Sequence, residues 1–251
     1  VYHCWLSNEH EEARHVAKTV RELYLKGAYE FNNFAVLYRV NVQSRAIEEA
    51  FRNGGIPYHI IGGISFYERK EIKDTIAYAR LVLNQNDNVS LRRVINCPPR
   101  GIGAATLSKI ENEAKKRSLS LFEVVKSLVK TNTITASVKE KLDGFIKLIE
   151  RMASKKYRTA SDMIRDIIEK SGYGGESLDE DRMQNINELI ASAAECDVPE
   201  FIDRVSLLTN LDDSSTGKAV TLMTLHSAKG LEFPVVLVIG LEEGDLPYFT
   251  A

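Results

Sequence analysis

Two short segments of this sequence carry side chains that could bind phosphate groups or nucleic acid. Residues 222–236 read LMTLHSAKGLEFPVV, and they offer a hydroxyl, an imidazole, an ammonium and a carboxylate from Thr224, His226, Lys229 and Glu232. Apolar, strand-like runs flank this polar turn on both sides. Because open α/β sheets bind ligands at the carboxyl ends of their strands, the turn is a candidate site. Its chemistry alone leaves an ordinary surface loop equally open.

The second segment is the apolar run FAVLY at residues 34–38, which ends in Tyr38 and is followed by Arg39. An arginine at the carboxyl end of a buried strand can reach out of the sheet, and its planar guanidinium suits a phosphate group. The structural alternative is an ion pair between Arg39 and Glu48 or Glu49 on the helix that follows.

Two further segments give weaker signals. Residues 62–74 begin with two glycines, which let the backbone turn sharply or approach a ligand, and they contain Phe66 and Arg69. Taken by themselves they favour a turn and a helix cap. Residues 96–106 contain Gly-Ile-Gly just before a predicted helix, so backbone N–H groups at the positive helix end could face a phosphate. A plain turn is the alternative there.

Charge is distributed unevenly along the chain, although the formal net charge is only −2. Residues 92–130 hold nine Lys and Arg against three Glu, a local net charge of +6, whereas residues 176–203 hold nine acids and one Arg. The basic stretch could track a phosphate backbone, or it could be a solvated helical surface.

All four segments resemble motifs of the superfamily 1A DNA helicases, the UvrD/PcrA/Rep group. The resemblance is densest from residue 222 to residue 247 and implies that Thr224 and His226 contact single-stranded DNA. It also implies that the nucleotide lies beside the turn that follows and beside the end of the strand 34–38; the residues concerned are Lys229, Gly230, Glu232, Tyr38 and Arg39.

Within that resemblance, Tyr38 would stack on adenine and Arg39 would contact the γ-phosphate as the catalytic arginine. Such an arginine stabilises charge that develops during phosphoryl transfer. Gln43 and Arg45 belong to the same motif. Phe66 and Arg69 would face DNA. A helix-hairpin-helix-like element would grip duplex backbone through Arg100, Gly101, Ile102, Gly103 and Thr106.

The elements that must position these residues follow from hydrophobic periodicity. Residues 1–84 and 216–251 alternate strand and helix patterns, which predicts an α/β fold with a parallel sheet, RecA-like by the resemblance. Residues 85–215 read as an all-helical insertion that would contact duplex DNA. We expect strands at 2–6, 34–38, 58–61, 220–224 and 233–239, the last as a central strand. Helices are predicted at 9–26, 44–53, 68–83, 90–96, 104–117, 121–129, 136–152, 160–171, 181–195 and 198–208.

Composition adds limits. Three scattered cysteines among 251 residues suggest reduced thiols rather than disulfides or a zinc site, and this suits the cytoplasm. No apolar run approaches membrane-spanning length and no signal peptide is visible. The sequence contains no G-x-x-x-x-G-K-[ST] phosphate loop, so we expect this chain to bind no ATP tightly by itself.

The resemblance therefore implies a fragment of an ATP-dependent, 3′-to-5′ DNA helicase that uses ATP and Mg²⁺ when intact. Its partners would be single-stranded DNA, a duplex junction, the missing first RecA-like domain and, through the insertion, repair proteins. Two alternatives stay open at this point: a helicase–nuclease subunit like RecB or AddA, and a non-catalytic module that binds DNA or docks a protein.

Overall fold

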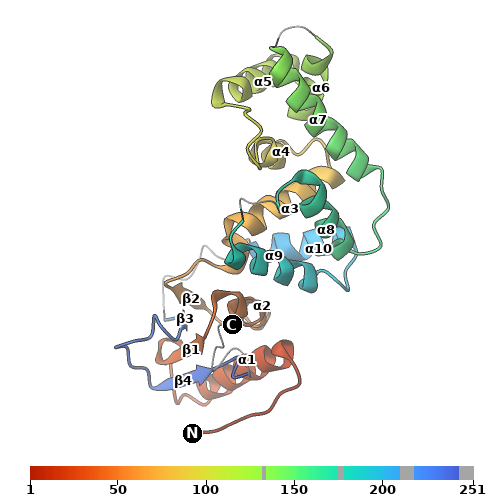
Figure 1. The fold of residues 1–251 in the computed structure, drawn as a ribbon. Coiled ribbons are helices and arrows are strands. Elements are labelled where there is room, and N and C mark those ends of the chain that lie inside the picture. Colours follow the sequence, from red (N-terminus) through yellow and green to blue (C-terminus); the bar gives the residue numbers. More distant parts are fainter. Residues whose placement is uncertain (132–133, 175–177, 210–217, 243–251) are drawn as a thin grey trace. The chain divides into compact units, whose positions relative to one another are not determined.

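The computed structural model describes residues 1–131, 134–174, 178–209 and 218–242. The chain divides into two compact units, one made of Val1–Arg69 with Ser206–Ala251 and the other of Lys70–Val205 (Figure 1). Each unit has its own architecture. The first is built on a sheet, and the regular elements described in the second are all helices.

The first unit contains a four-stranded sheet in the order β2-β3-β1-β4, with every neighbouring pair parallel. Its strands are β1 (Phe34–Tyr38), β2 (Tyr58–Ile61), β3 (Val220–Thr224) and β4 (Val235–Val238). The predicted α/β fold with a parallel sheet is confirmed, and the arrangement is that of a RecA-like domain. The expectation of a central strand at 233–239 is wrong, because β4 lies at an edge of the sheet that the described strands form.

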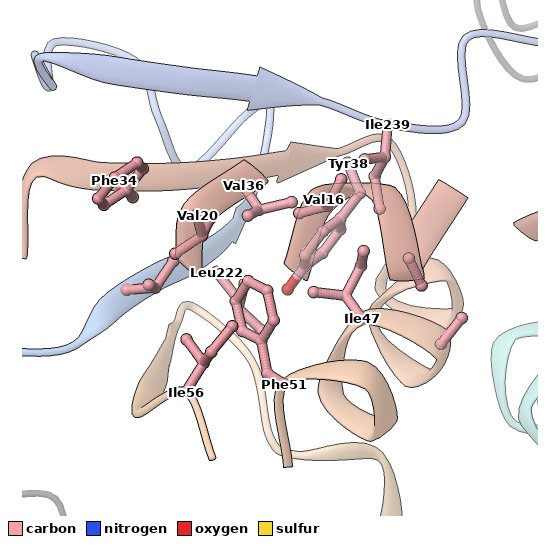
Figure 2. Packing of buried hydrophobic residues seen from close by; sticks show 13 residues of the cluster. Val16, Val20, Phe34, Val36, Tyr38, Ile47, Phe51, Ile56, Leu222 and Ile239 are labelled. Atoms are coloured by element: carbon pink, nitrogen blue, oxygen red, sulfur yellow. The ribbon is translucent and has the colours of Figure 1, made fainter. Parts of the chain in front are cut away.

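One face of this sheet is covered by two helices, α1 (Glu9–Leu25) and α2 (Ser44–Gly54). In α1, Ala13, Val16 and Val20 recur at helical spacing and are buried against the strands. The side chain of Asn8 caps the helix by accepting a hydrogen bond from the Glu11 N–H. Figure 2 shows residues from both helices packing onto β1 and β3 around Phe51 and Leu222.

The sheet and the two helices thus form one hydrophobic core that fixes where each strand ends. Helix α2 stops at Gly55, whose left-handed φ of 63° suits glycine and closes the helix. The predicted strand at 2–6 does not form. Those residues are exposed and pair with none of the described strands, since Tyr2 and Trp5 lie outside the core.

The second unit consists of helices packed around α3 (Lys70–Leu83), which contacts α4 (Asn88–Val94), α7, α8 and α9. The others are α5 (Ala104–Arg117), α6 (Leu121–Lys130), α7 (Ala136–Ala153), α8 (Ala160–Ser171), α9 (Glu180–Ser192) and α10 (Val198–Thr209), which belongs to this unit up to Val205. The sequence placed residues 70–84 with the α/β part. In the structure the unit boundary falls at Arg69, because α3 buries most of its side chains against the helical unit.

Buried polar groups tie this helical unit together. Asp74, almost fully buried on α3, accepts hydrogen bonds from Arg93 Nε at 2.6 Å, Cys97 Sγ at 3.2 Å and the Tyr173 hydroxyl at 2.7 Å. Burial, together with the Asp74 carboxylate, raises the pKa of the Cys97 thiol to about 11. The network links α3, α4 and the turn after α8, and it therefore holds the segment that leads into α5.

Candidate nucleotide and DNA site

The two segments with the strongest chemical signal meet at the carboxyl ends of neighbouring strands. Strands β1 and β3 are parallel, and Tyr38 pairs in register with Thr224. The N–H of Leu225 continues the ladder by donating to the Tyr38 carbonyl at 2.8 Å. Arg39 and the turn after Thr224 therefore leave the sheet side by side. The expectation that these segments share one rim is confirmed.

The end of β2 joins the same rim through Gly62. This residue has φ +73°, and a Cβ built on it would lie 2.8 Å from the Ser227 Oγ. A side chain there would displace the turn that carries His226, so the glycine allows close packing as well as the backbone conformation. Because every neighbouring pair of strands is parallel, all four strands end at this rim.

The turn after β3 is organised by Thr224. Its Oγ1 lies 2.9 Å from the Ser227 Oγ and accepts from the Ser227 N–H at 3.2 Å, while its carbonyl accepts from the Ala228 N–H at 3.1 Å. The Thr224 hydroxyl is therefore used in hydrogen bonds within the turn itself. His226, Lys229 and Glu232 are exposed, so their charged or polar ends are available to a ligand.

Arg39 is held through both its backbone and its side chain. Gln43 Oε1 accepts from the N–H groups of Arg39 at 2.9 Å and Val40 at 3.1 Å. The Arg39 Nη1 lies 2.9 Å from Nδ1 and 3.3 Å from Nε2 of His226. The residue expected at the γ-phosphate thus touches a residue expected at the DNA strand. The two carboxylates named above as alternative partners for Arg39 pair with other arginines: Glu49 lies 3.1 Å from Arg45, and Glu48 lies 3.8 Å from Arg52.

Tyr38 does not lie where the sequence placed it. Its ring is fully buried in the core between the sheet and helices α1 and α2 (Figure 2), and its hydroxyl has no hydrogen-bond partner among the described residues. Burial, with the nearby Glu48 carboxylate as a smaller cause, raises the pKa of this phenol well above its ordinary value. A fully buried ring offers no face to an adenine, so this structure does not provide the expected stacking surface.

The unpartnered hydroxyl gives a first prediction. Tyr38→Phe should leave stability unchanged or raise it by about 1 kcal/mol, because it removes a buried polar group that makes no hydrogen bond. Tyr67→Phe is the matched control, since the equally buried Tyr67 donates to Glu49 at 2.6 Å, and it should lose about 1 kcal/mol. Urea unfolding of the two variants measures this. A larger loss for Tyr38→Phe than for Tyr67→Phe would show that the Tyr38 hydroxyl is bonded after all.

Phe66 and Arg69, expected to face DNA, are also buried. The Arg69 guanidinium donates to the carbonyls of Asn41 at 2.8 Å and Ile64 at 3.3 Å, and it stacks over Phe66 at 5.1 Å. The Phe66 N–H donates to both carboxylate oxygens of Glu48, at 3.1 and 3.2 Å. These residues fix the loop after β2 from inside the protein, which corrects their predicted role in direct DNA contact.

Arg100 in the helical unit has a similar structural role. Its Nη1 donates to the carbonyls of Val94 and Cys97, both at 3.0 Å, and its Nη2 contacts the Tyr78 hydroxyl at 2.7 Å and the Ser171 carbonyl at 3.2 Å. The guanidinium also lies 5.3 Å above the Phe145 ring. These acceptors occupy the fork that a phosphate would need, so direct phosphate contact by Arg100 is not supported.

The Gly-Ile-Gly turn itself has the predicted position. Gly101 and Gly103 are exposed, Gly103 is the N-cap of α5, and its carbonyl accepts from the Thr106 N–H at 3.0 Å. Ile102 is buried and anchors the turn. A Cβ on Gly101 would lie 2.7 Å from the ammonium of Lys141 on α7, so this lysine stands beside the turn. Sequence reasoning missed Lys141, because nothing in the local pattern connects α7 with the turn.

Among the residues that the structure describes, no three His, Cys, Asp or Glu side chains gather so as to hold a metal ion. Within those same residues, no helix combines the length and hydropathy needed to cross a bilayer. Cys4, Cys97 and Cys196 are free thiols.

Comparison with known proteins agrees with this geometry. The family model for the UvrD-like helicase C-terminal domain matches residues 4–251. A probable DNA helicase II homolog of Rickettsia conorii is 42% identical over 97% of this chain and 39% of its own length. The ATP-dependent DNA helicase PcrA of Bacillus subtilis is 37% identical over 96% of this chain and 35% of its own length. PcrA of Staphylococcus epidermidis is 34% identical over 97% of the chain and 35% of its own length.

The chain thus spans less than two fifths of the length of these relatives. The family model nevertheless covers both units and every strand end described above. On this evidence the chain belongs to the family of UvrD-like helicase C-terminal domains.

Proposed function

We propose that this chain is the second motor domain, with its helical insertion, of an ATP-dependent 3′-to-5′ DNA helicase. The observation that carries the proposal is the shared rim, where Arg39 and the turn from Thr224 to Glu232 emerge from adjacent strands and touch through His226. A motor of this kind must convert nucleotide cleavage into strand movement. Groups suited to each ligand are therefore expected close together.

The rim residues fit a nucleotide on its phosphate side. Arg39 presents a guanidinium whose backbone is fixed by Gln43, and Lys229 adds an exposed ammonium on the neighbouring strand end. Two cations at the carboxyl end of a parallel sheet suit a polyphosphate. Glu232, also exposed, could accept a hydrogen bond from ribose. ATP would supply the energy of phosphoryl transfer, while Arg39 would stabilise the charge that develops.

Magnesium is a different case. The described residues hold no cluster of acids that could bind a metal ion. We therefore place the Mg²⁺ of the intact protein on the triphosphate and on groups outside this chain. The proposed partner for those groups is a first RecA-like domain that carries the phosphate loop, and the complete motor would work in the cytoplasm.

The DNA side of the proposal has two parts. The exposed His226 would contact single-stranded DNA, with Thr224 shaping the turn that presents it. The helical unit would contact duplex backbone through the exposed Gly101 and Gly103 and through Lys141 beside them. Lysines exposed on α5 and its neighbours, such as Lys109 and Lys115, add positive charge to this unit. Repair proteins are further candidate partners of the insertion.

Binding to a tailed duplex tests this proposal. The chain should bind a fluorescent duplex with a 3′ single-stranded tail at low salt, and the affinity should fall by about 10-fold or more between 50 and 200 mM salt, because lysine–phosphate contacts release counterions. Lys141→Glu should weaken binding, whereas Lys18→Glu, a matched exposed lysine on α1, should change it little. Absence of binding even at low salt would favour a module that docks a protein.

A further inference from the structure

Arg39 is held by two groups of different kinds. Its main-chain N–H is bonded to Gln43, which also takes the N–H of Val40, so the backbone at the end of β1 is fixed. Gly240 contributes to this fixation from the end of β4. Its φ is +66°, and a Cβ there would collide with the Gln43 side-chain amide. What remains adjustable in Arg39 is the direction of its side chain.

In this structure the Arg39 side chain contacts His226. The imidazole lies on an exposed turn whose backbone is braced by Thr224 and Ser227, and its Nδ1 is 2.9 Å from the Arg39 Nη1. A neutral imidazole can accept one hydrogen bond from a guanidinium, which has five N–H donors. The contact with His226 therefore helps to orient the Arg39 guanidinium.

We propose that His226 is a positioning residue for Arg39, so that the turn facing the DNA strand sets the angle of the arginine that acts on the nucleotide. This inference rests on the proposed function and adds to it. His226 is expected to influence ATP turnover directly through Arg39, in addition to any contact with DNA. A bound DNA strand that moves the His226 imidazole would also move the Arg39 guanidinium.

The test uses the intact helicase, saturated with single-stranded DNA, and two replacements of the same histidine. His226→Leu removes the acceptor and should lower kcat/KM for ATP by about tenfold, the scale of coupling between directly bonded residues. His226→Gln offers an amide oxygen to Arg39 and should stay within about threefold of the parent. His59→Leu is the matched control, because His59 contacts Thr221 at 3.3 Å on the neighbouring strands and should leave turnover unchanged.

A double-variant cycle with Arg39→Ala identifies the route. If His226 acts through Arg39, His226→Leu should cost about twofold or less once Arg39 has been replaced. If the two losses multiply, or if His226→Leu weakens strand binding while turnover at saturating DNA is unchanged, the positioning role is overturned. Failure of the proposed function looks different: Arg39→Ala alone would then leave ATP turnover intact. Thermal unfolding of each variant checks that the fold persists.

Discussion

Replacing Arg39 with Ala in the intact helicase is expected to lower DNA-stimulated ATP turnover by about 100-fold or more, the scale seen when a group that stabilises transition-state charge is removed. The expectation follows from its place at the carboxyl end of β1, with a backbone held by Gln43 and a side chain directed by His226. A guanidinium fixed in this way needs little reorganisation when charge develops on a phosphate. Steady-state hydrolysis at saturating single-stranded DNA measures the effect.

Two further variants are compared with Arg39→Ala. Arg39→Lys retains the charge and loses the planar fork, so we expect an intermediate rate. Arg14→Ala, on the exposed side of α1, is the matched control and should hydrolyse ATP like the parent. Binding of single-stranded DNA without nucleotide should change by less than about threefold in Arg39→Ala, because the proposed function assigns Arg39 to the nucleotide and His226 to the strand. Normal turnover in Arg39→Ala would refute the assignment.

Arg100→Ala is expected to cost about 2 kcal/mol of stability in the helical unit, because it removes a charged donor shared by several half-buried carbonyls. Arg100→Lys should cost nearly as much, since an ammonium on a flexible chain cannot reach the carbonyls of Val94, Cys97 and Ser171 together. Arg92→Ala is the control. Arg92 pairs with Glu111 at the surface and should contribute less than about 1 kcal/mol.

Urea unfolding followed by circular dichroism measures these three variants. Salt-dependent DNA binding by Arg100→Lys provides a second readout that separates the two roles of Arg100. A phosphate contact would tolerate lysine with little loss of stability, and only affinity for DNA would change. That result would support the contact between Arg100 and the duplex backbone that the sequence predicts. Loss of stability in both Arg100 variants supports the structural role instead, in which Arg100 donates to the carbonyls of Val94, Cys97 and Ser171.

Much of the fold was predictable because periodicity reports burial. The helix over Ala104–Arg117 and the strand over Val220–Thr224 have the predicted bounds; the helix buries Ile110 and Ala114, and the strand buries its first four residues. The prediction of a central strand at 233–239 failed for a physical reason. Its continuous apolar character is typical of a strand covered on both faces, yet β4 lies at the edge of the sheet formed by the described strands and leaves Val236 and Val238 exposed.

The site was predictable in its position and less so in its contacts. Parallel strands end at one rim, so Arg39 and the turn after Thr224 could be placed together before any coordinates were known. The side chains of Tyr38, Phe66, Arg69 and Arg100 could not be placed in this way, because motifs record which residue types occur and do not record which direction a side chain takes. Arginine is especially ambiguous, since its N–H donors can bind either a phosphate or a set of carbonyls.

The most direct test is the position of a nucleotide on the intact protein. A crystal structure with a non-hydrolysable ATP analogue and a single-stranded oligonucleotide should place a γ-phosphate oxygen within hydrogen-bond distance of the Arg39 guanidinium, about 2.7–3.2 Å, with the strand against His226. A nucleotide bound away from the ends of β1 and β3, with Arg39 facing only protein or solvent, would contradict the account.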